Sequence, residues 1–284
     1  MPSLAPSGVT ATVFGLVALA CYAASAVFYV FHLRRPRRSS GWAATGLACL
    51  GALLNLEALY ARSLHLQSVP YRDLVGSMAL LGYFLAVLNI LLELRHHDRS
   101  LGPFLMPVVF LFLLVALEVP PGKGPPGPEM KGPVFALHVT LNMAGYAAYA
   151  VACALAALYL WAGHALKSRT MVLEGVALRL PSLSYLERAT RTSLGVGVVA
   201  GTIGFCLGGY WASRVWKKEH PLWLLDPKVA AAAVILLFFF VVLVRAHRGA
   251  APVTTARLVV VGFGLVLLSY TVVNLFASRL HVFT

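Results

Sequence analysis

The sequence predicts an all-α, polytopic integral membrane protein with about eight transmembrane helices. Hydrophobic residues make up 60% of the 284-residue chain and charged residues only 12%, whereas soluble domains carry about 25% charged residues. The apolar residues are gathered in long runs, and roughly 20 such residues cross a bilayer as a helix. No polar stretch is long enough to bury a core of its own, so we expect a single transmembrane domain over residues 1–284.

The apolar runs, separated by short polar segments, define the expected helices in chain order. The first run lacks a preceding basic segment and is too long for the apolar part of a signal peptide, so we expect it to be retained. The eight runs cover residues 8–32, 42–60, 74–94, 102–119, 135–163, 193–211, 227–246 and 257–278.

Three connecting segments have distinctive compositions. The segment 120–133, PPGKGPPGPEMKGP, is too rich in Gly and Pro for regular structure and predicts a hairpin. The segment 164–192 is expected to carry a short surface helix around SLSYLERATR, capped by Ser182 or Ser184. The segment 209–228 is an expected outer loop that holds three of the five tryptophans.

The Lys and Arg residues between the runs predict the orientation. Alternate loops place 14 of the 23 Lys and Arg residues on one side and 9 on the other. Since cytoplasmic loops carry the excess of positive charge, both termini are expected to be extracytoplasmic. Topology and contact with membrane lipid therefore account for the net charge of +13, and no nucleic-acid partner is expected.

The four cysteines lie inside apolar runs and form no CxxC or CxxCH pattern. This disfavours thiol redox chemistry, a zinc site and covalent haem attachment to this chain. The glycines of the run GVGVVAGTIGFCLGG at 195–209 recur at spacings of three and four, which predicts close helix–helix packing.

Two histidines, His138 and His281, are expected at the outer ends of their helices, each at the end of a polar stripe. From His138, polar residues follow at offsets of 4, 8 and 11, and before His281 they stand at 3, 7 and 11. The stripe residues are Asn142, Tyr146 and Tyr149 on one helix and Ser278, Asn274 and Tyr270 on the other. Residues at such offsets lie on one face of a helix, and polar side chains within a bilayer are expected to face the interior of the helix bundle.

Two neutral imidazoles facing each other can supply both axial ligands of a haem iron. The tryptophans of the outer loop, Trp211, Trp216 and Trp223, lie between the two histidines in sequence. They would cover a flat porphyrin, or they form the aromatic belt that is common at the membrane interface.

Five segments carry a resemblance to a known family. They are SVPYRDLVGSMALLGYFLAVLNILLE at 68–93, LHVTLNMAGYAAYAVACALAALYLW at 137–161, LPSLSYLERATRTSLGVGVVAGTIGFCLG at 180–208, VRAHRG at 244–249 and LLSYTVVNLFASRLHVF at 267–283. In this order they resemble the cytochrome c assembly proteins of the haem-handling superfamily, and within them the CcsA/ResC component of the System II cytochrome c synthase. The resemblance covers about residues 66–284.

The resemblance implies roles for three histidines. His138 and His281 match the family's outer pair, which ligates haem b non-covalently through the iron. His247 matches a histidine near the cytoplasmic end that is associated with haem entry, although its position between Arg245 and Arg248 equally suits an interfacial residue. The resemblance also implies a multi-pass protein of the bacterial cytoplasmic (inner) membrane.

The tryptophan-rich loop departs from the family. The family pattern is approximately WGxxWxWDPKETW, and the matching segment here is VWKKEHPLWLLDPKVAA at 215–231. Trp216, Trp223 and Asp226 keep their places and, with Trp211, are the implied haem contacts. Leu225 replaces the tryptophan before the Asp, and Val-Ala-Ala replaces Glu-Thr-Trp after the Lys.

The function implied by the resemblance is a haem-handling step of cytochrome c maturation. Haem would move to the outer bis-histidine site and be presented for thioether attachment to the CxxCH motif of an apocytochrome c. As a haem lyase component, the chain would act with a CcsB/ResB-like membrane partner. The alternatives are a HemX-like haem-binding assembly or regulatory protein without lyase activity, a structural subunit, or a transporter. A transporter is disfavoured because no internal repeat is evident and Glu57 is the only unpaired acid expected deep in a helix.

Overall fold

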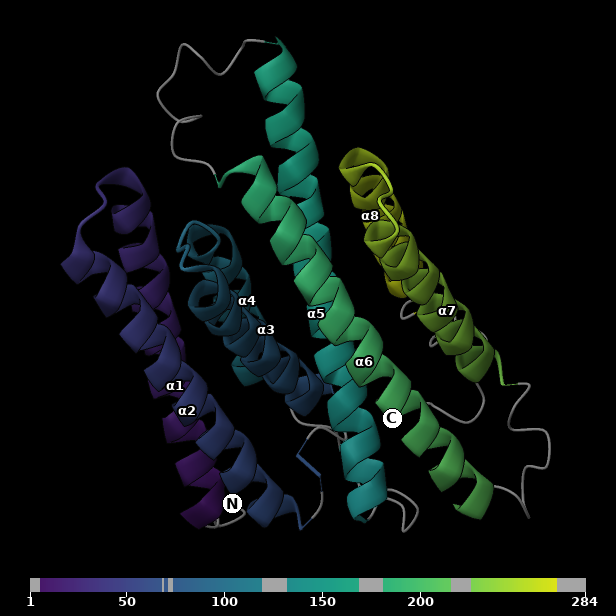
Figure 1. Cartoon of the computed structure of the whole chain (residues 1–284). Helices are drawn as coiled ribbons and strands as arrows, with labels where there is room; N and C mark the ends of the chain where they lie inside the picture. The colour runs from purple at the N-terminus through teal and green to yellow at the C-terminus, as the bar shows by residue number, and fades with distance from the viewer. Residues whose placement is uncertain are drawn as a thin grey trace. The chain divides into compact units, whose positions relative to one another are not determined.

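The computed structural model describes residues 6–67, 69–70, 74–118, 132–168, 181–215 and 226–269, and the regular elements within them are helices. Eight helices follow one another along the chain (Figure 1). They are α1 Pro6–Arg34, α2 Arg38–Leu66, α3 Leu74–His96, α4 Gly102–Glu118, α5 Pro133–Ser168, α6 Leu183–Val215, α7 Pro227–His247 and α8 Pro252–Leu268. The all-α prediction is confirmed, because lipid offers the backbone no hydrogen-bond partner and a helix satisfies its own.

Six of these helices are long and apolar enough to cross a bilayer, namely α1, α2, α3, α5, α6 and α7. Helix α4 and the described part of α8 are apolar but have 17 residues each, about the lower limit for a crossing. The last expected run, 257–278, extends beyond the described residues. The chain is thus a multi-pass membrane protein, and the side on which its termini lie stays a prediction.

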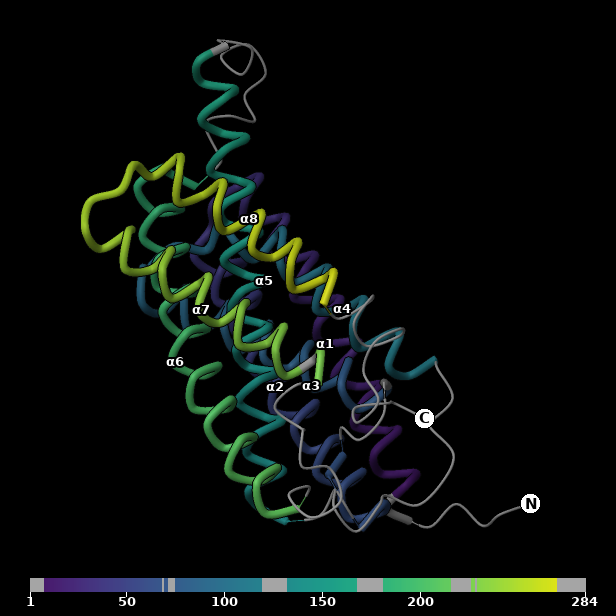
Figure 2. The backbone as a smooth tube through the Cα atoms, turned by 90° about the vertical axis from the view of Figure 1, so that its right-hand side faces the viewer, coloured from purple at the N-terminus to yellow at the C-terminus, as the bar shows by residue number. Residues whose placement is uncertain are grey.

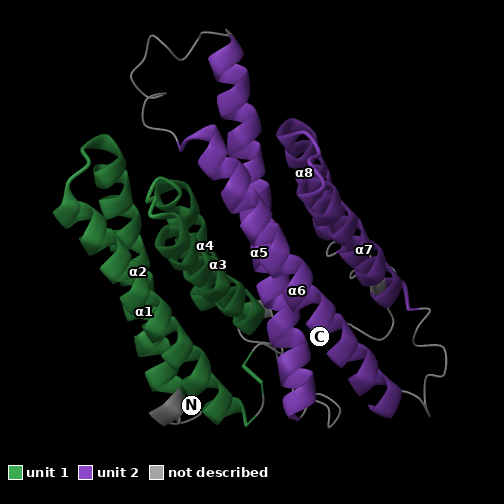
Figure 3. Ribbon diagram, in the orientation of Figure 1, with its two compact units in different colours: residues 1–131, 284 green, residues 132–283 purple. Residues whose placement is uncertain are grey.

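The helices form two compact units, α1–α4 and α5–α8 (Figure 3). Within the first unit, α1 packs against α2 and α4, and α3 packs against the same two helices. Within the second unit, α5 packs against α6 and α8, and α7 packs against the same two helices. Figure 2 shows the α7–α8 hairpin, which turns at Gly249 with a positive φ of 88° that glycine adopts without strain.

The first unit contains a buried carboxylate that differs from the acid singled out in the sequence. Glu57 is exposed on α2, whereas Glu93 of α3 is only 6% exposed. Tyr29 and Thr45 donate hydrogen bonds of 2.7 and 2.6 Å to its two carboxylate oxygens. Arg99 donates through Nε at 2.7 Å and forms an ion pair with it. Glu57 keeps its expected place within α2, with its side chain on the exposed surface of the helix.

Two helix boundaries differ from the sequence expectations. The short surface helix expected at 182–191 is instead the first part of α6, which runs on without a break. Ser182 caps it by accepting a hydrogen bond from the Tyr185 amide at 3.2 Å, so the choice of cap is settled. At the other end, α6 continues to Val215 and includes Trp211, which was expected in the loop.

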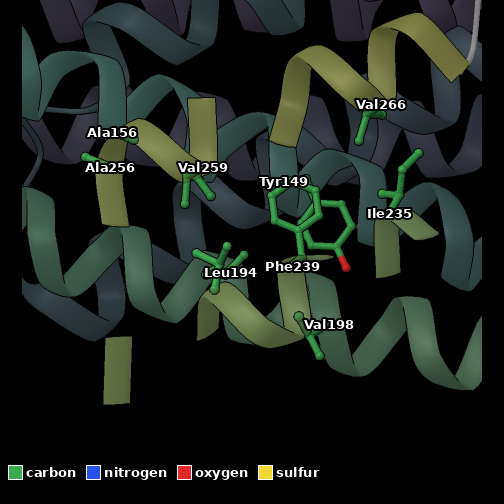
Figure 4. Packing of buried hydrophobic residues seen from close by; sticks show 11 residues of the cluster. Tyr149, Ala156, Leu194, Val198, Ile235, Phe239, Ala256, Val259 and Val266 are labelled. Carbon is green, nitrogen blue, oxygen red and sulfur yellow. The ribbon is translucent and has the colours of Figure 1, made fainter. Parts of the chain in front are cut away.

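The core of the second unit is built around one aromatic pair. The rings of Tyr149 on α5 and Phe239 on α7 are stacked 4.0 Å apart with an interplanar angle of 15° (Figure 4). Leu194 and Val198 of α6 and Val259 of α8 belong to the same buried cluster. Since residues from all four helices meet there, the orientation of α5 relative to α6 is firmly set.

Candidate functional site

The polar stripe of α5 faces the glycine stripe of α6. The contacts between the two helices form an antiparallel ladder in which each step along one helix is matched by an equal step along the other. From the α5 N-terminus inward, its pairs are Phe135–Trp211, His138–Gly208, Asn142–Gly204, Gly145–Gly201 and Tyr149–Gly197.

The glycines of α6 allow close helix packing and also leave space for side chains of α5. A Cβ on Gly204 would lie 2.8 Å from Nδ2 of Asn142, closer than such atoms can approach. A Cβ on Gly208 would overlap the His138 ring, and one on Gly197 would meet the Tyr149 ring. The predicted close approach of the helix is confirmed, and the space it leaves accommodates polar and aromatic side chains of α5.

His138 lies half-buried near the start of α5, with its imidazole against α6. Its Nδ1 is 2.7 Å from the carbonyl oxygen of Gly204. The side-chain amide of Asn142 donates to the carbonyl oxygen of His138 at 2.7 Å, and its nitrogen is also 3.1 Å from Nδ1. The imidazole is thus positioned by a backbone carbonyl, a neighbouring amide and the bare surface of Gly208.

These contacts determine the tautomer of His138. A carbonyl oxygen only accepts hydrogen bonds, so the 2.7 Å contact with Gly204 requires the proton to be on Nδ1. The longer contact from Asn142 would need Nδ1 to accept, so the amide donates to the His138 carbonyl oxygen instead. With the proton on Nδ1, the lone pair of the neutral ring is on Nε2. A carbonyl acceptor on the other nitrogen is how proteins commonly orient a metal-binding histidine.

An aromatic pair stands one turn beyond His138. The rings of Phe135 and Trp211 have centroids 5.1 Å apart with an interplanar angle of 45°. Trp211 therefore lies at the same end of the α5–α6 pair as His138. The structure brings these two predicted site residues together on adjacent helices.

Asp226 and His247 lie at opposite ends of α7. Asp226 is buried and directly precedes Pro227 at the start of the helix, at the end where α6 finishes. His247 is exposed at the last residue of α7, and its Nδ1 is 2.9 Å from the Leu243 carbonyl oxygen. A helix of this length spans about 30 Å, so the structure does not bring His247 together with His138.

The other predicted site residues, His281, Trp216 and Trp223, lie outside the described residues, as does the second polar stripe. Within the described ranges, no group of three or more His, Cys, Asp or Glu side chains could hold a metal ion. A haem iron needs only one imidazole on each face. A single imidazole with its lone pair on Nε2 therefore fits the haem hypothesis.

The fold and the site define a helical multi-pass membrane protein with an ordered imidazole at one end of its second unit. Residues 71–281 match the family model described as "Cytochrome C assembly protein", and the chain belongs to this family. The match includes His138, His247 and His281, and the matched range agrees with the resemblance found in the sequence.

Relatives support the same assignment at low identity. The chain is 27% identical to the cytochrome c biogenesis protein CcsA of Synechococcus elongatus, over 82% of this chain and 83% of the relative. It is 25% identical to CcsA of Chlorella vulgaris, over 75% and 76% of the two chains. It is also 24% identical to the inner membrane protein YpjD of Escherichia coli K12, over 73% and 78%.

Proposed function

We propose that this protein handles haem during cytochrome c maturation and binds haem b at the outer face of the membrane through His138 and His281. The observation that carries the proposal is the hydrogen bond from Nδ1 of His138 to the Gly204 carbonyl oxygen, which leaves the lone pair on Nε2. The membership of the cytochrome c assembly family supports the choice of haem as the ligand.

Residues at different positions in the chain would have different roles in haem binding. Gly204 and Asn142 hold the ring of His138, and Trp211 with the outer residues Trp216, Trp223 and Asp226 would cover the porphyrin. His247, at the far end of α7, would attract the haem carboxylates on the cytoplasmic side together with its neighbouring arginines, so that haem enters there. Bound haem supplies vinyl groups that form thioethers with the CxxCH thiols of an apocytochrome c.

The first experiment is spectroscopic. The protein is purified in detergent, and its oxidised and dithionite-reduced spectra are compared with those of His138→Ala and His281→Ala. A b-type spectrum that requires both histidines is expected. His164→Ala is the matched control, because His164 is exposed at the opposite end of α5 and its loss should leave the spectrum unchanged. Protein that stays haem-free when haem is supplied during expression would refute the proposal and favour a structural subunit.

Attachment activity needs a separate test, because Leu225 and the Val-Ala-Ala segment at 229–231 alter the tryptophan motif. The chain, with a CcsB/ResB-like partner, is expressed in a strain that lacks its own cytochrome c synthase. Restored c-type cytochromes would establish a synthase component. A haem-binding chain that fails to restore them, beside a working synthase as positive control, would point to the HemX-like alternative without lyase activity.

The partner and the membrane are also part of the proposal. We expect a CcsB/ResB-like protein to co-purify with this chain from a bacterial cytoplasmic membrane, as the membership of the cytochrome c assembly family implies. A lone chain with full attachment activity would contradict the need for a partner.

A further inference from the structure

An open pocket lies between α5, α6 and α7, and it begins one helical turn inward from His138. It has room for about one water-sized molecule, and its lining includes Asn142, Tyr146, Tyr149, Gly201, Phe205 and Leu236. The walls are mainly apolar. The polar groups of the lining are the amide of Asn142 and the hydroxyls of the two tyrosines, all on α5.

The hydroxyl of Tyr149 is the unusual group in this pocket. The residue is only 3% exposed, and its hydroxyl oxygen has no hydrogen-bond partner among the described residues. Buried polar groups in native proteins are nearly always paired, either with protein or with a bound molecule. An unpaired buried hydroxyl beside a pocket therefore indicates an occupant.

The Tyr149 side chain cannot turn away to find another partner. Its ring is stacked on Phe239, and a Cβ on Gly197 would lie only 2.5 Å from the ring. The hydroxyl oxygen is 3.4 Å from the position that a Cβ on Gly201 would take. The ring is thus held between α6 and α7, and Tyr149 lines the pocket. Its ring is drawn beside that of Phe239 in Figure 4.

We propose that this pocket binds a ligand oxygen that accepts a hydrogen bond from the Tyr149 hydroxyl. Two sources share this chemistry: a buried water molecule, and a carboxylate of the tetrapyrrole that His138 would bind. The second source rests on the proposed function, and the first does not. In either case the occupant lies directly inward from Asn142, whose amide holds the His138 backbone.

Replacement of the hydroxyl alone tests the proposal. Tyr149→Phe keeps the ring, its stacking on Phe239 and the fit against Gly197. Thermal unfolding of the purified variant and of the natural protein is measured without haem and with added haem, and haem affinity is titrated separately. Tyr60→Phe is the control, because Tyr60 is 60% exposed on α2 and its hydroxyl can be solvated.

The sign of the change decides the outcome. If a water accepts the hydrogen bond, Tyr149→Phe lowers the unfolding midpoint by roughly 2–4 °C without haem. If the tetrapyrrole is the acceptor, the midpoint falls only with haem present, and haem affinity drops about tenfold. A variant that is equal to or more stable than the natural protein in both conditions overturns the proposal, because the hydroxyl then has no partner to lose. Failure of the natural protein to bind haem would refute the proposed function while the haem-free comparison still decides whether the pocket is occupied.

Discussion

A Cβ atom on Gly208 would overlap the imidazole ring of His138, so the ring of α5 fills the space that this glycine leaves on α6. The contact fixes how far the ring can lie from the α6 backbone. It also brings Nδ1 within 2.7 Å of the Gly204 carbonyl oxygen one turn away. The position of the candidate haem ligand therefore depends on a residue that has no side chain.

Gly208→Ala is expected to displace the His138 ring and to abolish haem binding almost as fully as His138→Ala. The added methyl group cannot share the space of the ring, so the Nδ1 hydrogen bond is lost with the displacement. Absorption spectra of the purified variant measure the haem bound per protein.

Gly195→Ala is the matched control on the same helix. A Cβ at Gly195 meets no atom within 4 Å, and alanine favours a helix over glycine. This variant should bind haem normally and be at least as stable. Equal haem content in Gly208→Ala and Gly195→Ala would show that the His138 ring is not positioned as described.

Asn142→Ala is expected to weaken haem binding about 10- to 100-fold without preventing folding, because residues that hold a metal-binding histidine typically have effects of this size. Asn142 donates to the His138 carbonyl oxygen at 2.7 Å. Titration of haem into the haem-free protein measures the affinity. Thr202→Ala provides the comparison, since the Thr202 hydroxyl donates to the Val198 carbonyl oxygen of its own helix, and unchanged affinity is expected there.

Glu93→Gln is expected to destabilise the first unit by about 2 kcal/mol. Its carboxylate accepts hydrogen bonds from Tyr29 and Thr45 and pairs with Arg99, whose side chain is 22% exposed. The amide of Gln keeps the size of the carboxyl group but loses the negative charge that binds the Arg99 guanidinium. Its NH₂ group also replaces an acceptor oxygen, so it faces a hydrogen-bond donor of this network. Thermal unfolding in detergent measures the loss.

Glu57→Gln is the paired control, because Glu57 is exposed and its replacement should change the unfolding midpoint little. Since α1–α4 form a separate compact unit, haem spectra of any folded Glu93→Gln protein should keep their shape. Comparable midpoints for the two variants would count against the buried network.

A reporter fused to the C-terminus is expected to be active on the extracytoplasmic side, because 14 of the 23 Lys and Arg residues lie at or between the ends of the expected apolar runs on the opposite side. An alkaline phosphatase fusion, active only outside the cytoplasm, and a green fluorescent protein fusion, fluorescent only inside, give opposite signals. Fluorescence at the C-terminus would reverse the orientation and place His138 on the cytoplasmic side.

Part of the candidate site follows from sequence spacing alone. The offsets from His138 to Asn142 and Tyr149 place them on one helical face, and the structure confirms that this face meets α6. The glycines of α6 repeat the same spacing in reverse order. This match could have predicted from sequence that the two helices pack against each other. The buried network around Glu93 carried no such signal, because its hydrogen-bond donors Tyr29 and Thr45 lie 64 and 48 residues before it in the sequence.

The sequence by itself determined the class of this protein, because long apolar runs in a bilayer must form helices that satisfy their own backbone. It also determined the family, through motifs spread along most of the chain. Only the tertiary structure decided that the His138 proton is on Nδ1 and that the Tyr149 hydroxyl faces a pocket. Both depend on how closely α5 approaches α6. That distance is set by side-chain packing across four helices, and helical periodicity in the sequence does not encode it.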